Sequence, residues 1–138
     1  MGYVFDQETL PKLVSVTPGR ERTFFVNVEL AGHEAFLAGV LRYDRGRSPY
    51  HFHMGCEHFY LLLEGEATLR TEAGRQRLRP GHLVFIPEGD KHQLVAEGDT
   101  PLVFMEFQGP NRFKTTILEG GGEDLQWRRA DGTVWNQK

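Results

Sequence analysis

Between Thr23 and Pro110 the sequence repeats one pattern, in which a short run of β-branched and aromatic residues is followed by a turn signal rich in Gly and Pro. Such closely spaced runs without long helices between them predict an all-β sandwich or barrel, because a parallel α/β sheet needs helical crossovers. We expect about nine short antiparallel strands and little helix. The expected strands are Phe24–Glu29, Ala35–Tyr43, Tyr50–His53, His58–Leu63, Glu66–Arg70, Gln76–Leu78, Leu83–Ile86, His92–Val95 and Leu102–Phe107.

The length of the chain, 138 residues, suits one domain, 1–138. The N-terminal arm, residues 1–20, is interrupted by two prolines, and we expect it to hold at most one helical turn. After Pro110 the strand pattern ends, and the remaining tail contains both tryptophans, Trp127 and Trp135. Because exposed indoles are unfavourable, the tail is expected to pack on the barrel or on a second subunit.

Charge and hydropathy argue against several classes of partner. The net charge of −3 and the lack of a Lys/Arg cluster argue against nucleic-acid binding. The longest apolar run, Phe59–Leu63, is far shorter than the ~20 residues of a membrane span. The N-terminus lacks the basic start and the following apolar block that are typical of a signal peptide. Cys56 is the single cysteine, so no internal disulfide is expected. A cytoplasmic protein is therefore expected.

Potential metal ligands are concentrated in one stretch. Residues 46–65, GRSPYHFHMGCEHFYLLLEG, contain His51, His53, Glu57 and His58. Side chains two apart on a strand point to the same face, so the rings of His51 and His53 are aimed at one point. Imidazole is the commonest metal ligand in proteins. Taken alone, however, an H-x-H pair is also typical of two half-buried histidines.

A later stretch supplies one more histidine. In GHLVFIPEGDKHQLVA, residues 81–96, an apolar run leads into a turn at Pro87 and Gly89 that reverses the chain. His92 then begins the returning strand, close to where an inward-facing cluster would lie. The two stretches together favour a metal site inside the barrel.

The later stretch resembles the second motif of the cupin superfamily, G-x5-PxG-x2-H-x3-N. Cupins are small, jelly-roll-like β-barrels that hold a metal. The motif is matched at four positions and departs only at its end, where Ala96 replaces Asn; the matching residues are Gly81, Pro87, Gly89 and His92. Several matched positions make the resemblance specific in a way that one short motif is not. The resemblance implies a cupin barrel over about residues 24–110.

The earlier stretch resembles the first cupin motif, G-x5-HxH-x3–4-E-x6-G. Gly46 matches with a spacer one residue short, and His51, His53 and Gly65 match directly. Counting six residues back from Gly65, however, leads to His58 instead of the glutamate.

A shift of one residue along a strand turns a side chain to the opposite face. His58 is therefore expected to point inward and Glu57 outward. The resemblance implies one divalent metal whose ligands come from a hairpin and a later turn, namely His51, His53, His58 and His92. Glu57 is the alternative to His58.

Four neutral imidazoles would leave a bound cation its full charge, which favours Lewis-acid chemistry over redox chemistry. Zinc is the metal implied by the resemblance described next, with iron, nickel or manganese as alternatives. Because an imidazole binds metal only when deprotonated, metal occupancy is expected to fall below about pH 6.

Among cupins the chain resembles the aromatic polyketide cyclases of the tetracenomycin and resistomycin type, which act in antibiotic biosynthesis. This resemblance implies a lyase-like cyclase in which the metal polarises a carbonyl of a largely apolar polyketide during an aldol-type ring closure. One alternative is a dioxygenase that uses iron, nickel or manganese and O2 on an enolic or aromatic substrate. The other is a cupin that binds a small molecule without turnover.

The assembly state is suggested by strands that are apolar on both faces, FYLLL and LVFI. Such strands are covered on both sides, by extra strands or by a partner subunit. Together with the tryptophan-bearing tail, they favour a homodimer.

The general base is unknown from sequence. Tyr43, Tyr60, Glu106 and Arg42 are candidates for acid–base chemistry if their strand parity faces them inward.

Other reactive residues receive no chemistry. His33 and His82 are expected in turns and Cys56 as a loop thiol, while Ser15 and Ser48 lack the GxSxG setting of a serine nucleophile.

Overall fold

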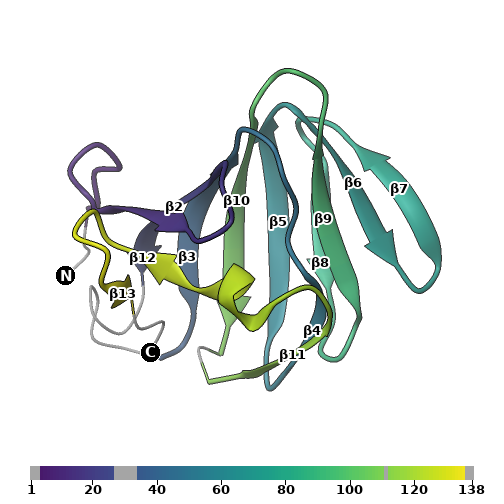
Figure 1. The fold of residues 1–138 in the computed structure, drawn as a ribbon. Helices are drawn as coiled ribbons and strands as arrows, with labels where there is room; N and C mark the ends of the chain where they lie inside the picture. The colour runs from purple at the N-terminus through teal and green to yellow at the C-terminus, as the bar shows by residue number, and fades with distance from the viewer. Residues whose placement is uncertain (1–3, 27–33, 111, 136–138) are drawn as a thin grey trace.

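In the computed structural model, which describes residues 4–26, 34–110 and 112–135, the chain folds into two antiparallel β-sheets (Figure 1). The first sheet has the strand order β13 (Val134–Trp135), β12 (Trp127–Arg128), β1 (Lys12–Ser15), β2 (Arg20–Val26), β3 (Leu37–Tyr43), β10 (Leu102–Gly109), β5 (Glu57–Glu64) and β8 (Leu83–Ile86). The second has the order β11 (Lys114–Glu119), β4 (Tyr50–Met54), β9 (His92–Glu97), β6 (Glu66–Thr71) and β7 (Gly74–Leu78). A short 3-10 helix, η1, covers Gly122–Leu125. The all-β prediction is confirmed.

Each of the nine predicted strands is present, with ends that differ by a few residues. The largest difference is at β2, which begins at Arg20 instead of Phe24, and the last residues of that predicted strand, 27–29, lie outside the described residues. Strand β8 has the predicted bounds. Turn signals therefore located the strands well wherever both neighbours in sequence were also strands.

Two regions that we expected to lack strands contain them. The N-terminal arm holds β1, and the chain after Pro110 holds β11, β12 and β13. These strands pair with distant parts of the chain: Ser15 of β1 lies opposite Trp127 of β12, and Thr115 of β11 lies opposite His53 of β4. Figure 1 shows the yellow C-terminal strands near the purple N-terminal segment, in keeping with the pairing of β12 with β1. Because the partner strands are remote, local sequence pattern could not reveal them.

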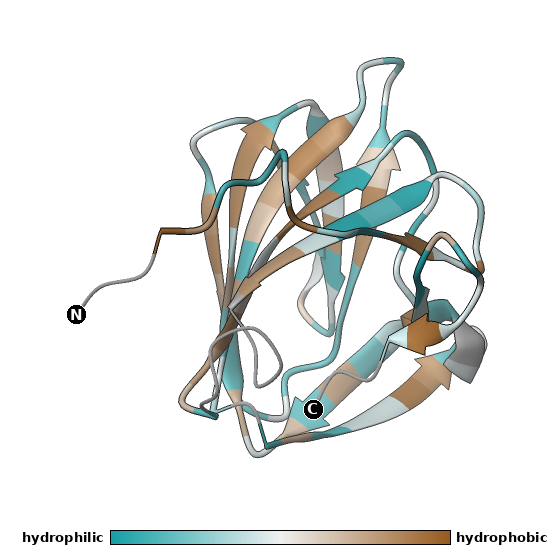
Figure 2. Cartoon of the chain, turned by 90° about the vertical axis from the view of Figure 1, so that its left-hand side faces the viewer, coloured by the Kyte–Doolittle hydropathy of each residue, from teal (hydrophilic) through white to brown (hydrophobic). Residues whose placement is uncertain are grey.

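The hydrophobic core lies between the two sheets. Alternate residues of β10, from Leu102 to Gln108, are buried, as are Tyr60 and Leu62 of β5 and Leu94 of β9. In Figure 2 hydrophobic and hydrophilic segments alternate along the strands, as expected when one face is inward. Burial of these apolar side chains is the main stabilising contribution, at roughly 25 cal/mol per Å².

The tryptophan-bearing tail packs on the barrel, which confirms one of the two expected positions for it. Trp127 and Trp135 are 2% and 4% exposed. The ring of Trp135 stacks on Phe24 of β2 with a centroid distance of 5.8 Å. The tail thus closes the inner face of β1 and β2.

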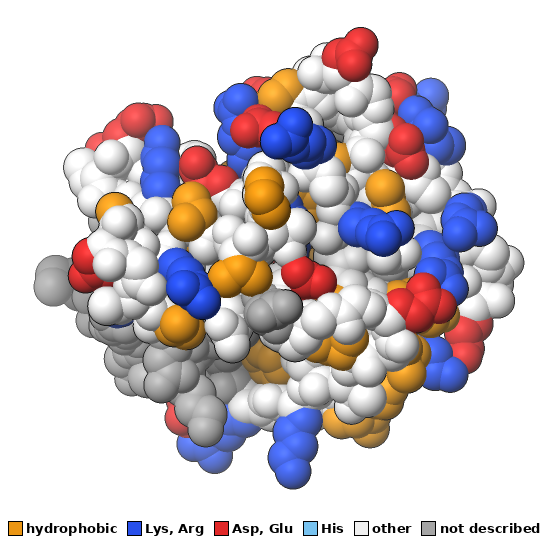
Figure 3. All heavy atoms as spheres, in the orientation of Figure 1, with side chains coloured by type: hydrophobic (Ala, Val, Ile, Leu, Met, Phe, Trp, Pro, Cys, Tyr) orange, Lys and Arg blue, Asp and Glu red, His pale blue; other side chains and the backbone are white. Residues whose placement is uncertain are grey.

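The surface carries mixed charge. On the face drawn in Figure 3, basic and acidic side chains are interspersed among uncharged groups, so the described residues form no single basic field there. Among these residues no helix has the length and hydropathy to span a membrane.

Candidate functional site

Four histidine rings meet between the two sheets. His51 and His53 lie on β4, His92 begins β9, and His58 lies near the start of β5. The centroid of the His92 ring lies 4.3 Å from that of His51 and 4.8 Å from that of His58, and the His53 centroid lies 4.8 Å from His51 and 5.1 Å from His58. His51, His58 and His92 are buried, and His53 is half-buried. The structure therefore brings all four predicted residues together.

Strand register and a turn position three of these rings. His51 and His92 are directly opposite each other on β4 and β9. The turn before β9 is closed by the Asp90 amide, which donates to the Pro87 carbonyl at 3.2 Å. The Gly89 amide donates to the His53 carbonyl at 2.9 Å, so the same turn is tied to β4. The turn in the second histidine-bearing stretch thus places His92 beside the histidines of the first stretch.

The fourth ring comes from the opposite sheet. We expected His51, His53 and His58 to lie on one hairpin, but β4 belongs to the five-stranded sheet and β5 to the eight-stranded sheet. The chain crosses between the sheets at Gly55, which has a φ of +95° and whose Cβ, if present, would lie 2.8 Å from the Arg112 carbonyl oxygen. A side chain at this position would be strained. The crossing places His58 across the cavity from the other rings.

The structure also decides which of two neighbours faces inward. His58 is 1% exposed, whereas Glu57 is exposed on the other side of β5. The parity argument therefore predicted both orientations correctly. The carboxylate of Glu57 is directed away from the histidine cluster.

Hydrogen bonds orient the rings of the other three histidines. The Nδ1 atom of His51 lies 2.7 Å from the Pro49 carbonyl oxygen, and that of His92 lies 2.9 Å from the Asp90 carbonyl oxygen. A carbonyl accepts only, so these Nδ1 atoms carry the proton and their Nε2 atoms keep a lone pair. The Nδ1 atom of His53 lies 2.7 Å from the Thr115 hydroxyl. This is the outer hydrogen bond that metal-binding histidines usually make.

The inner nitrogens lack partners of their own. Both ring nitrogens of His58 and the Nε2 atom of His92 are buried and make no hydrogen bond with described residues. A buried polar nitrogen without a partner destabilises the fold unless something else satisfies it. These atoms are therefore suited to an added electron-pair acceptor.

Burial keeps the cluster uncharged near neutral pH. Desolvation by burial, followed by repulsion from the neighbouring histidines, lowers the pKa of His53 and of His92 to about 2. Desolvation also lowers the pKa of His58 to about 4, although the Glu106 carboxylate raises it. The pKa of His51 is lowered too, mainly by burial. Neutral imidazole is the form that binds a metal.

The spacing of three of the rings is compatible with a bound cation. Ligand nitrogens of His51, His53 and His92 lie within 4.8 Å of one another. Two nitrogens on one tetrahedral zinc ion, each at about 2.1 Å from the metal, are about 3.4 Å apart, so the rings would turn inward on binding. His58 is not part of this group of close nitrogens, although its ring centroid lies 4.8 Å from that of His92 and 5.1 Å from that of His53.

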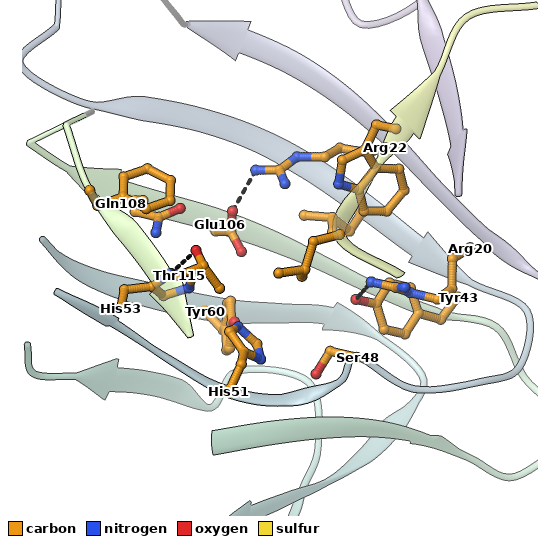
Figure 4. Close-up of a pocket in the computed structure, with 14 residues that line it drawn as sticks. Arg20, Arg22, Tyr43, Ser48, His51, His53, Tyr60, Glu106, Gln108 and Thr115 are labelled. Carbon is orange, nitrogen blue, oxygen red and sulfur yellow. Dashed lines mark hydrogen bonds and ion pairs between the residues drawn. The ribbon is translucent and has the colours of Figure 1, made fainter. Parts of the chain in front are cut away.

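A pocket reaches the cluster at His51 and His53. It has a volume of about 210 Å³ and is shown in Figure 4. Charged and polar groups form much of its wall, which is more polar than the largely apolar substrate expected from the sequence would suggest. The lining residues that the figure labels are Arg20, Arg22, Tyr43, Ser48, His51, His53, Tyr60, Glu106, Gln108 and Thr115. Leu41, Phe113, Leu125 and Trp127 complete the wall.

The sequence of this region matches a known protein family. The family described as "Cupin domain" matches residues 40–107, the segment that runs from β3 through β10 and contains all four histidines. The chain contains a cupin domain. A comparison of the sequence with curated proteins gave no match.

Solved structures with the same fold include several cupins. The polyketide cyclase RemF from Streptomyces resistomycificus superposes with a TM-score of 0.75 at 20% identity, over 90% of each chain. A sugar phosphate isomerase of the cupin superfamily from Silicibacter pomeroyi gives a TM-score of 0.73 at 20% identity, over 98% of this chain and 93% of the other. Oxalate decarboxylase from Lactobacillus farciminis gives 0.68 at 17% identity, over 83% of this chain and 35% of the other. At such identities the likeness concerns the fold.

Three of the four acid–base candidates face the pocket of this cupin. Tyr43, Tyr60 and Glu106 line it and are buried. Glu106 forms an ion pair with Arg22, as Figure 4 shows. Burial raises the pKa of Tyr60 well above its usual value, so its hydroxyl keeps its proton. Arg42 instead lies on the surface and pairs with Asp44 at 3.0 Å.

The remaining reactive residues lie outside the cluster. Cys56 is a buried loop thiol that accepts a hydrogen bond from Gln108 at 3.2 Å, and burial raises the pKa of this thiol. His82 lies in a turn, where its Nδ1 accepts a hydrogen bond from the Arg79 amide. His33 falls outside the described residues.

Sequence reasoning missed the two arginines of the pocket. Arg20 and Arg22 have the same strand parity as buried Phe24, and both are almost fully buried. The pattern R-E-R-T-F therefore carried a signal, namely two charged residues on the face that the following aromatic residue turns to the core. The predicted strand begins only at Phe24, so the parity of these two arginines lies outside it.

Proposed function

We propose that this cupin binds one divalent metal through His51, His53, His58 and His92, with zinc favoured, and that it catalyses a carbonyl reaction of the cyclase type. The observation that carries this proposal is the set of buried, unpartnered nitrogens on His58 and His92. They belong to rings that burial keeps neutral, and they face the two rings of β4. A cation satisfies these nitrogens at once.

When bound, the metal supplies Lewis acidity that polarises a carbonyl oxygen and stabilises an enolate. With four neutral ligands the cation keeps its full charge, whereas a carboxylate ligand such as Glu57 would cancel part of it. The outward orientation of Glu57 supports the all-histidine set. This set of ligands therefore suits activation of a carbonyl better than stabilisation of a metal in a higher oxidation state.

Glu106 is our choice for the residue that accepts a proton. Its carboxylate lies in the pocket wall and is close enough to raise the pKa of both His51 and His58. Arg22 pairs with this carboxylate and holds its orientation. Tyr60, which retains its proton, is a donor for an oxygen that becomes negative during the reaction.

The pocket suggests which part of a substrate enters. Its volume of about 210 Å³ is below the 300–1,000 Å³ of a typical drug-sized ligand site. Hydrogen-bond donors such as Gln108 and the arginines suit a segment rich in ketone or enol oxygens, while Phe113 and Trp127 suit its carbon skeleton. A polyketide chain of alternating carbonyls has this chemistry, and the shared fold with RemF supports the choice. Only the reacting part of such a chain would lie inside.

A combined metal and oxygen experiment tests the function. Protein purified without added metal is analysed for its metal content, and oxygen uptake is followed with enolic and poly-β-ketone substrates. We expect zinc, no oxygen uptake, and conversion of the ketone substrate to a dehydrated ring. Iron, nickel or manganese with oxygen uptake would instead establish a dioxygenase, and a tightly bound compound recovered unchanged would establish a binding protein.

Replacing Glu106 with Gln is expected to lower kcat roughly 100-fold, the lower end of the usual contribution of a positioned general base. Glutamine keeps the shape of the side chain but cannot accept the proton. Metal content, measured on the same sample, should not change. A kcat equal to that of the unmodified enzyme would remove Glu106 from the mechanism.

We also propose a homodimer that forms through the outer face of β5, β8 and β10. This face carries Phe59, Leu61, Leu83, Met105 and Phe107, and Leu83 is 62% exposed. Strand β8 is also the last strand of its sheet among the described residues, so its outer edge is available for pairing. A two-fold axis through such a face brings identical apolar groups together.

Changing Leu83 to Glu is expected to convert the dimer to a monomer, because it would bury a charge in the interface of each copy. Sedimentation velocity measures the change. The control is Val14 to Glu, which alters an apolar residue of similar exposure, 48%, on distant β1. A monomeric unmodified protein, or equal effects of both variants, would contradict this surface.

A further inference from the structure

Two arginine side chains enter the pocket from one strand. Arg20 and Arg22 of β2 are 4% and 5% exposed. Their guanidinium carbons lie 5.2 Å and 5.6 Å from the centre of the Trp127 ring, so both cations are beside the same indole. Figure 4 shows both reaching the pocket that the histidines line from the other side. Buried arginines in a polar pocket require negative charge nearby.

The protein supplies that charge to only one of them. Arg22 pairs with Glu106. Arg20 donates to the Asp124 carbonyl at 2.8 Å, to the Tyr43 hydroxyl at 3.1 Å and to the Ser15 hydroxyl at 3.4 Å, all of which are uncharged acceptors. Within the described part of the chain, Arg20 forms no ion pair.

The side chain of Asp124, whose backbone carbonyl accepts from Arg20, is occupied elsewhere. The carboxylate of Asp124 accepts hydrogen bonds from the Thr17 hydroxyl and from the Gly121 amide. In addition, the Nε atoms of both arginines are buried and have no partner among the described residues. The described residues around the pocket thus leave one positive charge uncompensated and two buried donors unpartnered, even before a metal adds to the charge. Such an arrangement is unfavourable unless a ligand completes it.

We propose that Arg20 and Arg22 form an anion subsite that binds a carboxylate or phosphate group of the substrate. Guanidinium groups recognise both anions through paired hydrogen bonds. The subsite lies across the pocket from His51 and His53, so the substrate carries its anionic group at one end and its reacting carbonyl at the other. This assignment of substrate class rests on the proposed function, but the anion subsite itself requires no metal.

The test uses protein freed of metal with a chelator, and inorganic phosphate and acetate as probes. Tryptophan fluorescence reports binding, because both guanidinium groups lie beside Trp127. We expect a saturable signal, and the probe that binds more tightly identifies the anion as phosphate or carboxylate. Changing Arg20 to Gln should weaken binding at least about tenfold, whereas Arg20 to Lys should retain part of the affinity.

A second variant, which is expected to strengthen anion binding, distinguishes loss of the subsite from misfolding. Changing Glu106 to Gln removes the carboxylate that competes for Arg22, and it should strengthen anion binding about tenfold. The control, Arg77 to Gln, changes an exposed arginine that pairs with Glu66 and should leave the affinity unchanged.

The outcomes separate this proposal from the metal proposal. No saturable signal in the unmodified protein, equal affinity after Arg20 to Gln, or no gain after Glu106 to Gln would each overturn the anion subsite. A protein that binds these anions as expected but takes up no metal would retain the subsite and overturn the proposed function. A protein that binds zinc but neither anion would overturn the anion subsite and leave the proposed metal site standing.

Discussion

Replacing His58 with Ala is expected to weaken zinc binding by a few hundredfold. Structural zinc sites bind with about 10–16 kcal/mol, so each of four ligands contributes roughly 3 kcal/mol. We expect His58 to contribute to zinc affinity as a ligand and not only to core packing, because both of its ring nitrogens are buried and unpartnered. The centroid of the His92 ring lies 4.8 Å away. Competition with a chromophoric chelator near neutral pH measures the affinity.

The matched control is the neighbouring residue. Changing Glu57 to Ala should leave zinc affinity unchanged, because this carboxylate is exposed on the outer side of β5. A variant that changes His58 to Gln keeps most of the side-chain volume and separates loss of a ligand from formation of a cavity. If the Glu57 variant loses zinc and both His58 variants keep it, the metal is bound by the Glu57 carboxylate and His58 is a core residue.

Lowering the pH from about 7.5 to about 5 is expected to destabilise the metal-free protein by several kcal/mol. In the folded state the pKa is about 2 for His53 and for His92 and about 4 for His58. In the unfolded chain a histidine has a pKa of about 6.5. Below that value the unfolded state binds protons that the folded state does not, so stability falls as the pH falls.

The size of this effect follows from the same values. Each of the three histidines would contribute a loss of about 2 kcal/mol at pH 5, and the sum is comparable to the total stability of many small domains. Their mutual repulsion is counted in each pKa, so the sum is an upper limit. The loss begins near pH 6.5 and, for His58, levels off below about pH 4.

Urea unfolding at a series of pH values measures this loss. A His82 to Ala variant is the control, because this half-buried turn residue lies outside the cluster and its removal should leave the slope against pH unchanged. Zinc should increase stability near neutral pH and keep this effect down to about pH 4, where His58 begins to bind a proton in the folded protein. The loss of metal expected from the free histidine pKa, below about pH 6, is thus shifted to lower pH by burial. Stability that stays constant between about pH 6.5 and 5 would show that the rings are solvated in the folded protein.

Much of the barrel and the histidine cluster could be predicted from the sequence. The turn signals located the strands from β2 to β10, and the spacing from Gly65 distinguished inward His58 from outward Glu57. Both inferences rest on local quantities, namely the residue count per strand and the alternation of faces. Such quantities remain valid whatever the rest of the chain does.

Non-local pairing limited the prediction. Strands β1 and β11 become visible only through their partners, because KLVS and KTTILE are short and isolated in sequence. The placement of β4 and β5 in opposite sheets also depends on what each pairs with, so a count of residues between His53 and His58 could not reveal it. Arg20 and Arg22 were missed because β2 begins before the apolar run that identified it.

The most direct test of the metal centre is X-ray absorption spectroscopy of the zinc-loaded protein. We predict a first shell of nitrogen at about 2.0–2.1 Å, with the outer-shell scattering of four imidazole rings. The His58 to Ala variant should then show three rings. A shell that contains sulfur, a shell dominated by carboxylate oxygen, or a protein that takes up no zinc near neutral pH would contradict a centre built from His51, His53, His58 and His92.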